Sequence, residues 1–341
     1  MSQDKKPILA ITIGDVAGIG PEVIVGGWSR IVQQGDCVPI VYGNNDVIEK
    51  AIALLGCDFT VQSINNPVLA EPSKNVIPCL NCCTVDVLGV RPGEISGNAG
   101  EAAYHAIVTA TLHAMFHKVD AIVTMPINKK SFNMAGCSFP GHTELIASRC
   151  GVENFAMMLY LGPSEGIKGT AGLAVVHVTL HMAMRNIFHN ITLENILAKI
   201  RLANDFMSKM KETPPAIGVC SLNPHAGERG LFGQEELNII EPTVELAQEE
   251  GINVTGPLSA DTIMLQAQNG EFDAVVAMFH DQGHIALKLL GMHQAVNITL
   301  GLPIIRTSVA HGTAFDIAWQ GKANPASFIE SCRVACVLAR G

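Results

Sequence analysis

The sequence predicts an α/β protein built on a largely parallel sheet. Short segments that are apolar throughout, at 8–13, 38–42 and 274–279, alternate with longer segments whose apolar residues recur at helical spacing. Strands of this kind are typical of parallel sheets, because helices cover both of their faces. Several of the apolar segments end abruptly at polar or ionisable residues, and open α/β sheets bind ligands at such strand ends. We therefore expect a binding site at the carboxyl edge of the sheet.

Composition limits the possible classes of function. A chain of 341 residues has room for roughly one to three domains, and no internal repeat or flexible linker divides it. Because 48% of the residues are hydrophobic and only 16% are charged, few charges are left to coat the surface, and we expect an oligomer. The net charge of −9 argues against a nucleic-acid-binding protein, whose affinity comes largely from basic contacts with phosphate. An anionic ligand would need a local cluster of positive groups.

Cysteine usage and hydropathy indicate a cytoplasmic protein. The ten cysteines are scattered, and dense disulfide frameworks belong to short secreted domains, so we expect free thiols. Cys79, Cys82 and Cys83 lie close together in the chain, but no second pair follows that would complete a structural zinc site. The apolar run at 8–13 is too short for a signal peptide, and no uncharged apolar stretch reaches the roughly 18 residues of a spanning helix.

The first half of the chain alternates strands and helices. The strand 8–13 runs into the turn GDVAGIGPE, whose glycines allow tight backbone geometry and whose Pro21 suits the first position of a helix. This turn is not the dinucleotide-binding fingerprint, because Val23 stands where the third glycine should fall. Residues 60–97 are less regular and rich in Asn, Pro and Gly, so no elements are assigned to them. The other predicted elements are a strand at 38–42, a helix at 46–55, a helix at 98–117 and a strand at 120–126.

The second half continues this alternation. His142 and Thr143 open a short helix after a turn; Thr143 suits an ordinary N-cap, whereas His142 lies where a helix N-terminus would receive a phosphate. The amphipathic helix 193–210 is expected to be packing surface without chemistry. The remaining predicted elements are strands at 155–161, 173–178, 216–221 and 274–279, and a helix at 232–248.

Three histidines follow apolar strands and precede turns or helices: His181, His225 and His280. The ends of neighbouring parallel strands converge on one edge, so three neutral imidazoles there would form a catalytic zinc-type site with an open position. His113 and His117 also have the i, i+4 spacing of metal ligands, but a solvated helix end explains this pair better.

Groups that bind anions accumulate in the segment after 280. Lys288, Asn297 and Arg306 supply donors suited to carboxylate and phosphate, and a guanidinium can bind either with two parallel hydrogen bonds. A packed core has little use for so many polar groups at the ends of apolar segments. The segment is therefore interpreted as an active site for a small anionic substrate, with a metal beside it.

Several motifs between about residues 8 and 335 are long enough to compare with known families. They read GDVAGIGPE, GHTE, SLNPHAGE, FGQEE, GPLSADT, HDQG and VNITLGLPIIRTSVAHGTAFDIA. These motifs resemble the 4-hydroxythreonine-4-phosphate dehydrogenase family, which is NAD-dependent and dimeric. The resemblance implies the α/β/α fold of isocitrate and isopropylmalate dehydrogenases, with an active-site cleft between two subdomains that the partner subunit completes. One subdomain would comprise about 1–125 plus 290–341, and the other about 126–289.

The resemblance also assigns roles to residues of this chain. The metal ligands would be His181, His225 and His280. The substrate contacts would be His142, Thr143, Lys288, Asn297 and Arg306. NAD or NADP would bind a loop similar to the adenosine-binding loop of isocitrate and isopropylmalate dehydrogenases, at His311, Gly312, Thr313 and Ala314. Lys288 is the candidate catalytic base, with His142 as the rival.

The implied reaction is the oxidation, with decarboxylation, of 4-phosphooxy-L-threonine to 3-amino-2-oxopropyl phosphate. A divalent metal would polarise the hydroxyl that is oxidised; zinc fits three imidazoles best, and magnesium, manganese or cobalt are alternatives.

Departures from the pyridoxine-pathway pattern leave the exact substrate open. The chain reads TLHMAMRN at the first metal ligand, HDQGH with an additional His284, and GERG with Arg229 where a second glycine is usual. HVTLH and HDQGH are similar to a paralogous branch, which includes dehydrogenases of D-threonate and D-erythronate 4-phosphate and a terephthalate dihydrodiol dehydrogenase. Phosphate acyltransferases use a related fold, but their chemistry has no role for a metal-histidine triad. A non-catalytic binding module would not need metal ligands and an adenosine loop together.

Overall fold

The computed structural model describes residues 5–153 and 155–340, and it divides into two units. Unit 1 comprises Met1–Phe155 and Leu302–Gly341, and unit 2 comprises Ala156–Gly301. The chain thus leaves unit 1 once and returns to it. Among the described residues, no helix combines the length and the apolarity needed to cross a bilayer.

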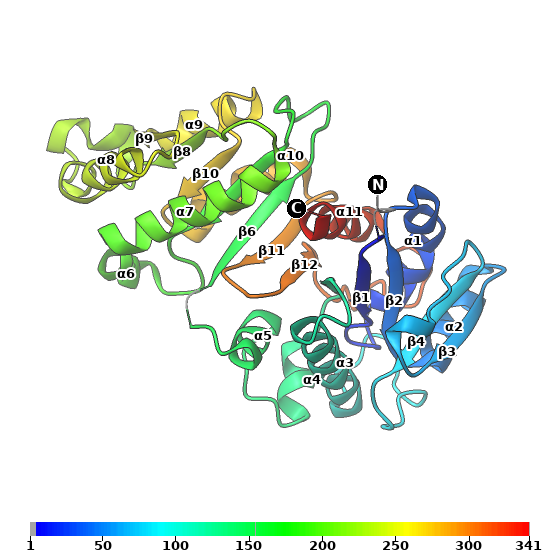
Figure 1. Cartoon of the computed structure of the whole chain (residues 1–341). Coiled ribbons are helices and arrows are strands. Elements are labelled where there is room, and N and C mark those ends of the chain that lie inside the picture. The colour runs from blue at the N-terminus through cyan, green and yellow to red at the C-terminus, as the bar shows by residue number, and fades with distance from the viewer. Residues whose placement is uncertain (1–4, 154, 341) are drawn as a thin grey trace. The chain divides into compact units, whose positions relative to one another are not determined.

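The described residues of unit 1 form six strands in parallel pairing. Their order is β3 (Thr60–Ile64), β4 (Val76–Asn81), β2 (Val38–Gly43), β1 (Ile8–Thr12), β5 (Ala121–Thr124) and β12 (Ile305–Val309) (Figure 1). Each pair in this order is parallel, including β12 with β5, so all six carboxyl ends lie on the same edge. The largely parallel α/β class predicted from the sequence is confirmed.

Alternate residues of the unit 1 strands enter two separate cores. Leu9 and Ile11 of β1 pack in the core that includes α1 (Gly20–Gln34) and α11 (Ala326–Arg340). Ala10, between them, packs in the core that includes α3 (Gly97–Met115). Successive side chains of a strand point to opposite faces, so a strand covered by helices on both sides must be apolar throughout. The helix α2 (Asn45–Leu55) also packs against α1.

Residues 126–155 belong with unit 1, contrary to the subdomain boundary expected near 125. Their helices are α4 (Lys129–Met134) and α5 (His142–Cys150). Phe132, Leu145 and Ile146 are buried in one cluster with residues of α3, and this packing holds the segment in unit 1. The second boundary lies at 301/302 rather than near 290, because β11 pairs with a strand of unit 2.

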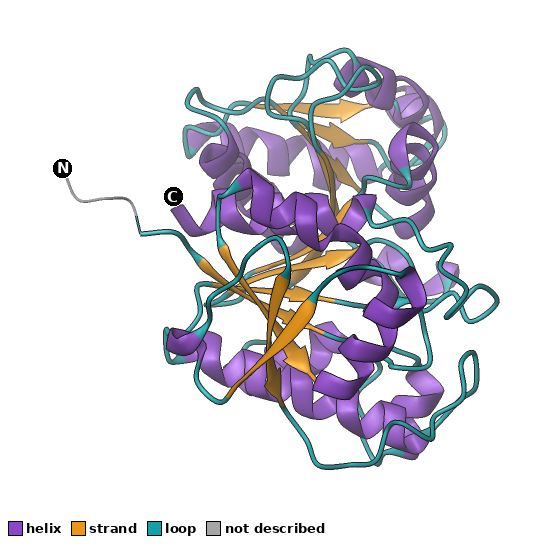
Figure 2. Ribbon diagram, turned by 90° about the vertical axis from the view of Figure 1, so that its right-hand side faces the viewer, coloured by secondary structure: helices purple, strands orange, loops and turns teal. Residues whose placement is uncertain are grey.

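Unit 2 contains a mixed sheet with helices packed against it (Figure 2). The strand order is β11 (Val296–Leu300), β6 (Ala156–Leu161), β7 (Leu173–His177), β10 (Ala274–Ala277), β8 (Ile217–Cys220) and β9 (Val254–Leu258). Among the described residues, β6 runs antiparallel to both β11 and β7, whereas β7, β10, β8 and β9 pair in parallel in that order. The helices are α6 (Met184–Ile187), α7 (Leu193–Met210), α8 (Glu241–Glu249), α9 (Ala260–Gln268) and α10 (His280–Gly291).

The structure shows regular elements within 60–97, the segment to which the sequence analysis assigned none. This segment forms β3, the short 3₁₀ turn Pro67–Leu69 and β4. The sequence signal of β3 is weak because the strand lies at the sheet edge, where most of its residues are partly or fully exposed and need not be apolar. The helix expected at 232–248 begins as the π-helical turn Glu236–Ile240 and continues as α8.

The lack of a side chain at Gly100 lets α3 pack closely against α4. A Cβ atom at this position would lie 2.0 Å from the backbone oxygen of Ser131. We expect Gly100→Ala to lower the free energy of unfolding by about 1–3 kcal/mol, because the clash is with backbone and outweighs the higher helix propensity of alanine. Urea unfolding measures this change. Gly89→Ala is the control, since a Cβ there would meet nothing within 4 Å. Equal stabilities of the two variants would contradict the prediction.

Candidate active site

Three neighbouring parallel strands of unit 2 end at one edge. β10 lies between β7 and β8 and pairs in parallel with both. His181 follows β7, His280 opens α10 just after β10, and His225 follows β8. The sequence prediction that these strands are neighbours is therefore confirmed, and each histidine lies in a connection that leaves the same edge of the sheet.

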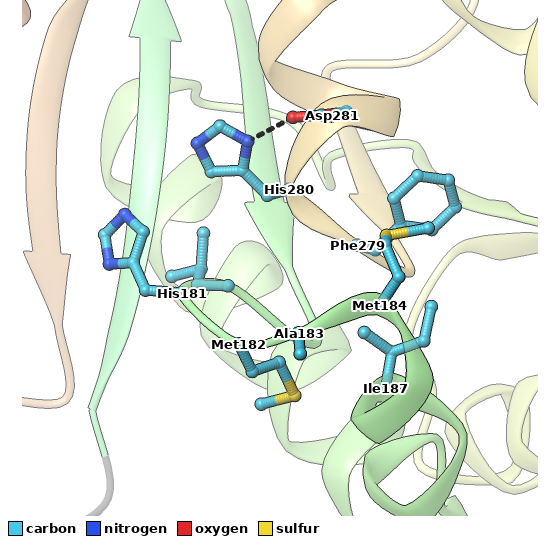
Figure 3. A pocket seen from close by; sticks show the side chains of 9 residues that line it. His181, Met182, Ala183, Met184, Ile187, Phe279, His280 and Asp281 are labelled. Atoms are coloured by element: carbon cyan, nitrogen blue, oxygen red, sulfur yellow. Dashed lines mark hydrogen bonds and ion pairs between the residues drawn. The ribbon is translucent and has the colours of Figure 1, made fainter.

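His181 and His280 form a pair at this edge. Their ring centroids are 5.8 Å apart, and both side chains line an open pocket of about 470 Å³ (Figure 3). The Nδ1 atom of His280 lies 2.6 Å from Oδ1 of Asp281. An ionised carboxylate only accepts hydrogen bonds, so Nδ1–H donates and the lone pair of Nε2 remains available. Metal-ligating histidines are commonly held in this way by a carboxylate.

His225 does not join this pair within one chain. It lies in the 3₁₀ segment Pro224–Gly230, where five consecutive residues from His225 to Arg229 have positive φ angles of 44–73°. The buried Glu236 fixes the start of this segment by accepting hydrogen bonds from the backbone N–H groups of Leu222 and Asn223, at 2.8 and 2.7 Å. Within residues 5–153 and 155–340, no three His, Cys, Asp or Glu side chains are close enough together to hold a metal ion. The predicted triad is thus present as a pair plus a separate histidine.

The donors that do come together fit a divalent cation. Imidazole nitrogens suit zinc, copper, iron and nickel, and the oriented ring of His280 beside His181 supplies two such donors at the mouth of one pocket. A third protein ligand is needed for the usual catalytic arrangement.

Two further histidines, His177 and His284, lie next to this pair, and the sequence alone did not predict that they meet. The Nδ1 atom of His284 lies 3.0 Å from Nε2 of His177, and both side chains are buried. Burial, together with neighbouring histidines, lowers the pKa of His177 to about 3 and the pKa of His284 to about 4. The sequence spacing could have indicated that these histidines cluster. His284 lies four residues after His280 on a helix, and His177 lies four residues before His181.

The other predicted substrate contacts of unit 2 come from two elements. Lys288 is exposed and lies on α10 one turn beyond His284, whose pKa its charge helps to lower. Asn297 lies on β11 and donates from Nδ2 to the sulfur of Met157 at 3.3 Å. Its buried Oδ1 has no hydrogen-bond partner among the described residues. An unsatisfied acceptor of this kind suits a ligand that donates a hydrogen bond.

Unit 1 contains a buried cation beside a buried imidazole. Arg306 on β12 is 2% exposed, and its Nε and Nη2 atoms donate to Oγ1 of Thr124 at 3.1 and 2.7 Å. His142 is the first residue of α5, followed by Thr143, and Nε2 of His142 is buried with no hydrogen-bond partner in the described part of the chain. Burial and the charge of Arg306 lower the pKa of His142 to about 3, and burial lowers that of Arg306 to about 10. A helix N-terminus, a guanidinium and a neutral imidazole together suit an anion.

The loop that is predicted to bind the cofactor is hydrogen-bonded to the GDVAGIGPE turn that follows β1. The backbone N–H of Ile19 donates to the carbonyl of Thr313 at 3.1 Å. The indole N–H of Trp319 donates to the carbonyl of Val16 at 2.9 Å, and the N–H of Gly321 donates to the buried carboxylate of Glu22 at 3.0 Å. The motif GDVAGIGPE therefore holds the loop that contains His311, Gly312, Thr313 and Ala314.

The minor metal hypotheses are not supported. Within residues 5–153 and 155–340, Cys79, Cys82 and Cys83 do not form part of any group of three side chains that could hold a metal ion. His113 hydrogen-bonds the hydroxyl of Tyr42 at 2.8 Å, and His117 lies beyond the end of α3.

The lowered pKa of His142 predicts a dependence of stability on pH. Unfolding returns this imidazole to an ordinary pKa near 6.5, so below that pH the unfolded chain binds a proton that the folded chain does not. Stability is therefore lost as pH falls from about 6.5 toward 3. Between pH 7.5 and 5, we expect His142→Gln to lose up to about 2 kcal/mol less than the wild type, measured by urea unfolding. The exposed His189 is the control, and His189→Gln should keep the wild-type pH dependence. An unchanged dependence in His142→Gln would contradict the prediction.

Comparison with known proteins identifies the family of this chain. Residues 35–335 match the family described as Pyridoxal phosphate biosynthetic protein PdxA. The chain is 42% identical over 333 residues to a D-threonate 4-phosphate dehydrogenase of Pectobacterium atrosepticum, covering 97% of this chain and 99% of that protein. It is 40% identical over 339 residues to a 4-hydroxythreonine-4-phosphate dehydrogenase of Desulforapulum autotrophicum, with coverages of 98% and 96%. A crystal structure of 4-hydroxythreonine-4-phosphate dehydrogenase from Klebsiella pneumoniae matches with a TM-score of 0.87 at 40% identity, covering 100% of both chains. The chain belongs to the PdxA family.

Proposed function

We propose that this enzyme is an NAD-dependent, metal-assisted dehydrogenase of a four-carbon 3-hydroxy acid that carries a phosphate on C4. The observation that carries the proposal is the buried Arg306 beside His142. The guanidinium of Arg306 acts on His142, the first residue of α5, and a positive charge beside a helix N-terminus is suited to binding an anion. The names of both relatives describe substrates with such a phosphate.

The roles of the residues follow from their chemistry. Arg306, Thr143 and the N-terminus of α5 bind the phosphate, and the neutral ring of His142 lies beside them. Asn297 offers a buried acceptor to the substrate. Lys288 is the base that takes the hydroxyl proton, because it is exposed on α10 whereas His142 is buried beside a positive charge.

Two groups that the protein binds would supply the remaining chemistry. His181, His280 and a third histidine would hold a divalent cation, zinc or alternatively magnesium, manganese or cobalt, which acts as a Lewis acid on the substrate oxygen. NAD or NADP would be held at His311, Gly312, Thr313 and Ala314 and would supply the hydride acceptor. Oxidation at C3 places a ketone β to the carboxylate, which then leaves as carbon dioxide.

Two substrates of this class are candidates. The family resemblance first indicated 4-phosphooxy-L-threonine, with 3-amino-2-oxopropyl phosphate as the product. The motifs HVTLH and HDQGH, together with the 42% identical relative, favour D-threonate 4-phosphate.

A substrate panel tests the proposal. We expect NAD reduction with 4-phosphooxy-L-threonine or D-threonate 4-phosphate and added divalent metal, and at least about 100-fold lower kcat/KM for the same acid without phosphate, since charge-assisted hydrogen bonds are lost. His142→Gln should narrow this preference, because it removes a contact only with the phosphorylated substrate. Equal kcat/KM values for phosphorylated and unphosphorylated acids would contradict the phosphate site and favour a dihydrodiol substrate. Activity that resists chelators, as in a phosphate acyltransferase, would contradict the metal.

We further propose a homodimer in which His225 of one protomer completes the metal site of the other. This follows from the separation of His225 from the pair of His181 and His280 within one chain. Closed two-fold dimers allow each chain to supply the same residue to its partner.

Mixed dimers test this arrangement. Randomly assembled His225→Ala and Lys288→Ala subunits should recover roughly a quarter of wild-type activity, because half of the dimers are mixed and one of their two sites is intact. His280→Ala mixed with Lys288→Ala is the control and should recover nothing, since both residues lie on α10 of one chain. No recovery in confirmed His225→Ala/Lys288→Ala dimers would place His225 and Lys288 of each site in the same protomer.

A further inference from the structure

The imidazole ring of His284 stacks on the ring of His280. The ring of His284 is parallel to that of His280, with centroids 3.9 Å apart and an interplanar angle of 11°. His284 also hydrogen-bonds His177, with Nδ1 of His284 3.0 Å from Nε2 of His177, and these two centroids are 4.5 Å apart. All three residues belong to unit 2, on α10 and at the end of β7.

The motif HDQGH at 280–284 builds this arrangement residue by residue. Asp281 holds Nδ1 of His280 at 2.6 Å. Gln282 accepts from the N–H of Met278 at 2.7 Å and donates to the carbonyl of Ser221 at 2.8 Å, so it ties the start of α10 to the ends of β10 and β8. Gly283 leaves the space for His177, because a Cβ there would lie 2.5 Å from the imidazole Nε2.

The side chains of His177 and His284 are too deeply buried to bind a ligand from solvent. They are 1% and 6% exposed, whereas His280 lies at the pocket. Within residues 5–153 and 155–340, they are not part of any group of three potential metal ligands. His284 can therefore influence metal binding through the ring of His280. The χ2 angle of a histidine varies widely unless neighbouring groups restrict it.

We propose that His284, held by its hydrogen bond to His177, is a positioning residue that fixes the ring plane of His280 for metal binding. This inference rests on the proposed function, in which His280 is a metal ligand. Asp281 fixes one edge of the imidazole and His284 covers one face, so Nε2 points in a single direction. Groups that orient a metal ligand typically change metal affinity by about 10–100-fold when they are removed.

Metal titration of the full-length protein tests the proposal. The probe is Co²⁺, followed by calorimetry and by its visible absorption. His284→Ala should weaken Co²⁺ binding by about 10–100-fold, because the stack is lost. His284→Phe keeps a flat ring against His280 and should bind within a few-fold of the wild type. His177→Leu should also weaken binding, because it releases His284. The exposed His189→Ala is the matched control and should bind as the wild type does.

Each outcome decides between the possibilities. Wild-type affinity in His284→Ala would overturn the proposal. Equal loss in His284→Ala and His284→Phe, with a changed Co²⁺ spectrum in both, would make His284 a ligand and also overturn it. If His284→Ala does not fold, as judged by circular dichroism, the affinity of His284→Phe decides alone: a loss of tenfold or more contradicts the stacking role. His181→Ala and His280→Ala test the metal site itself, and wild-type affinity in both would refute the proposed function instead.

Discussion

The parallel pairing of β10 with β7 and β8 is the constraint on which the candidate site depends. Because all three strands run in one direction, the connections that carry His181, His280 and His225 leave the same edge of the unit 2 sheet. Hydrogen bonds at the strand ends reinforce this pairing: Thr179 donates to the carbonyl of Met278, and Gln282 reaches the carbonyl of Ser221. The pairing of β7 with β10 is what brings His181 close to His280.

The two units differ in the charge of their buried ionisable side chains. Unit 1 keeps the permanently charged Arg306 at 2% exposure, with Thr124 as a neutral hydrogen-bond acceptor. Unit 2 instead buries His177 and His284 as neutral rings, which is possible because an imidazole can release its proton whereas a guanidinium cannot. A retained buried charge suits a site for a doubly charged phosphate. Neutral buried rings suit the support of a metal ligand.

Much of the fold could be predicted because buried parallel strands are apolar throughout. The segments 8–13 and 274–279 predicted β1 and β10 with small errors at their ends. The edge strand β3 was missed, since exposure at an edge removes the apolar signal. The subdomain boundary near 125 differed because residues 126–155 pack against α3, and such packing between segments far apart in sequence leaves no local pattern.

By itself, the sequence determined the α/β class, the alternation of strands and helices, and the kinds of side chain at each strand end. These are local properties, set by the spacing of apolar residues and by where that spacing stops. The tertiary structure alone decided which of those side chains meet. It brings His181 to His280 and leaves His225 on a separate loop. It also places His284 between His280 and His177, because helix geometry aligns residues four apart and strand pairing sets β7 beside β10.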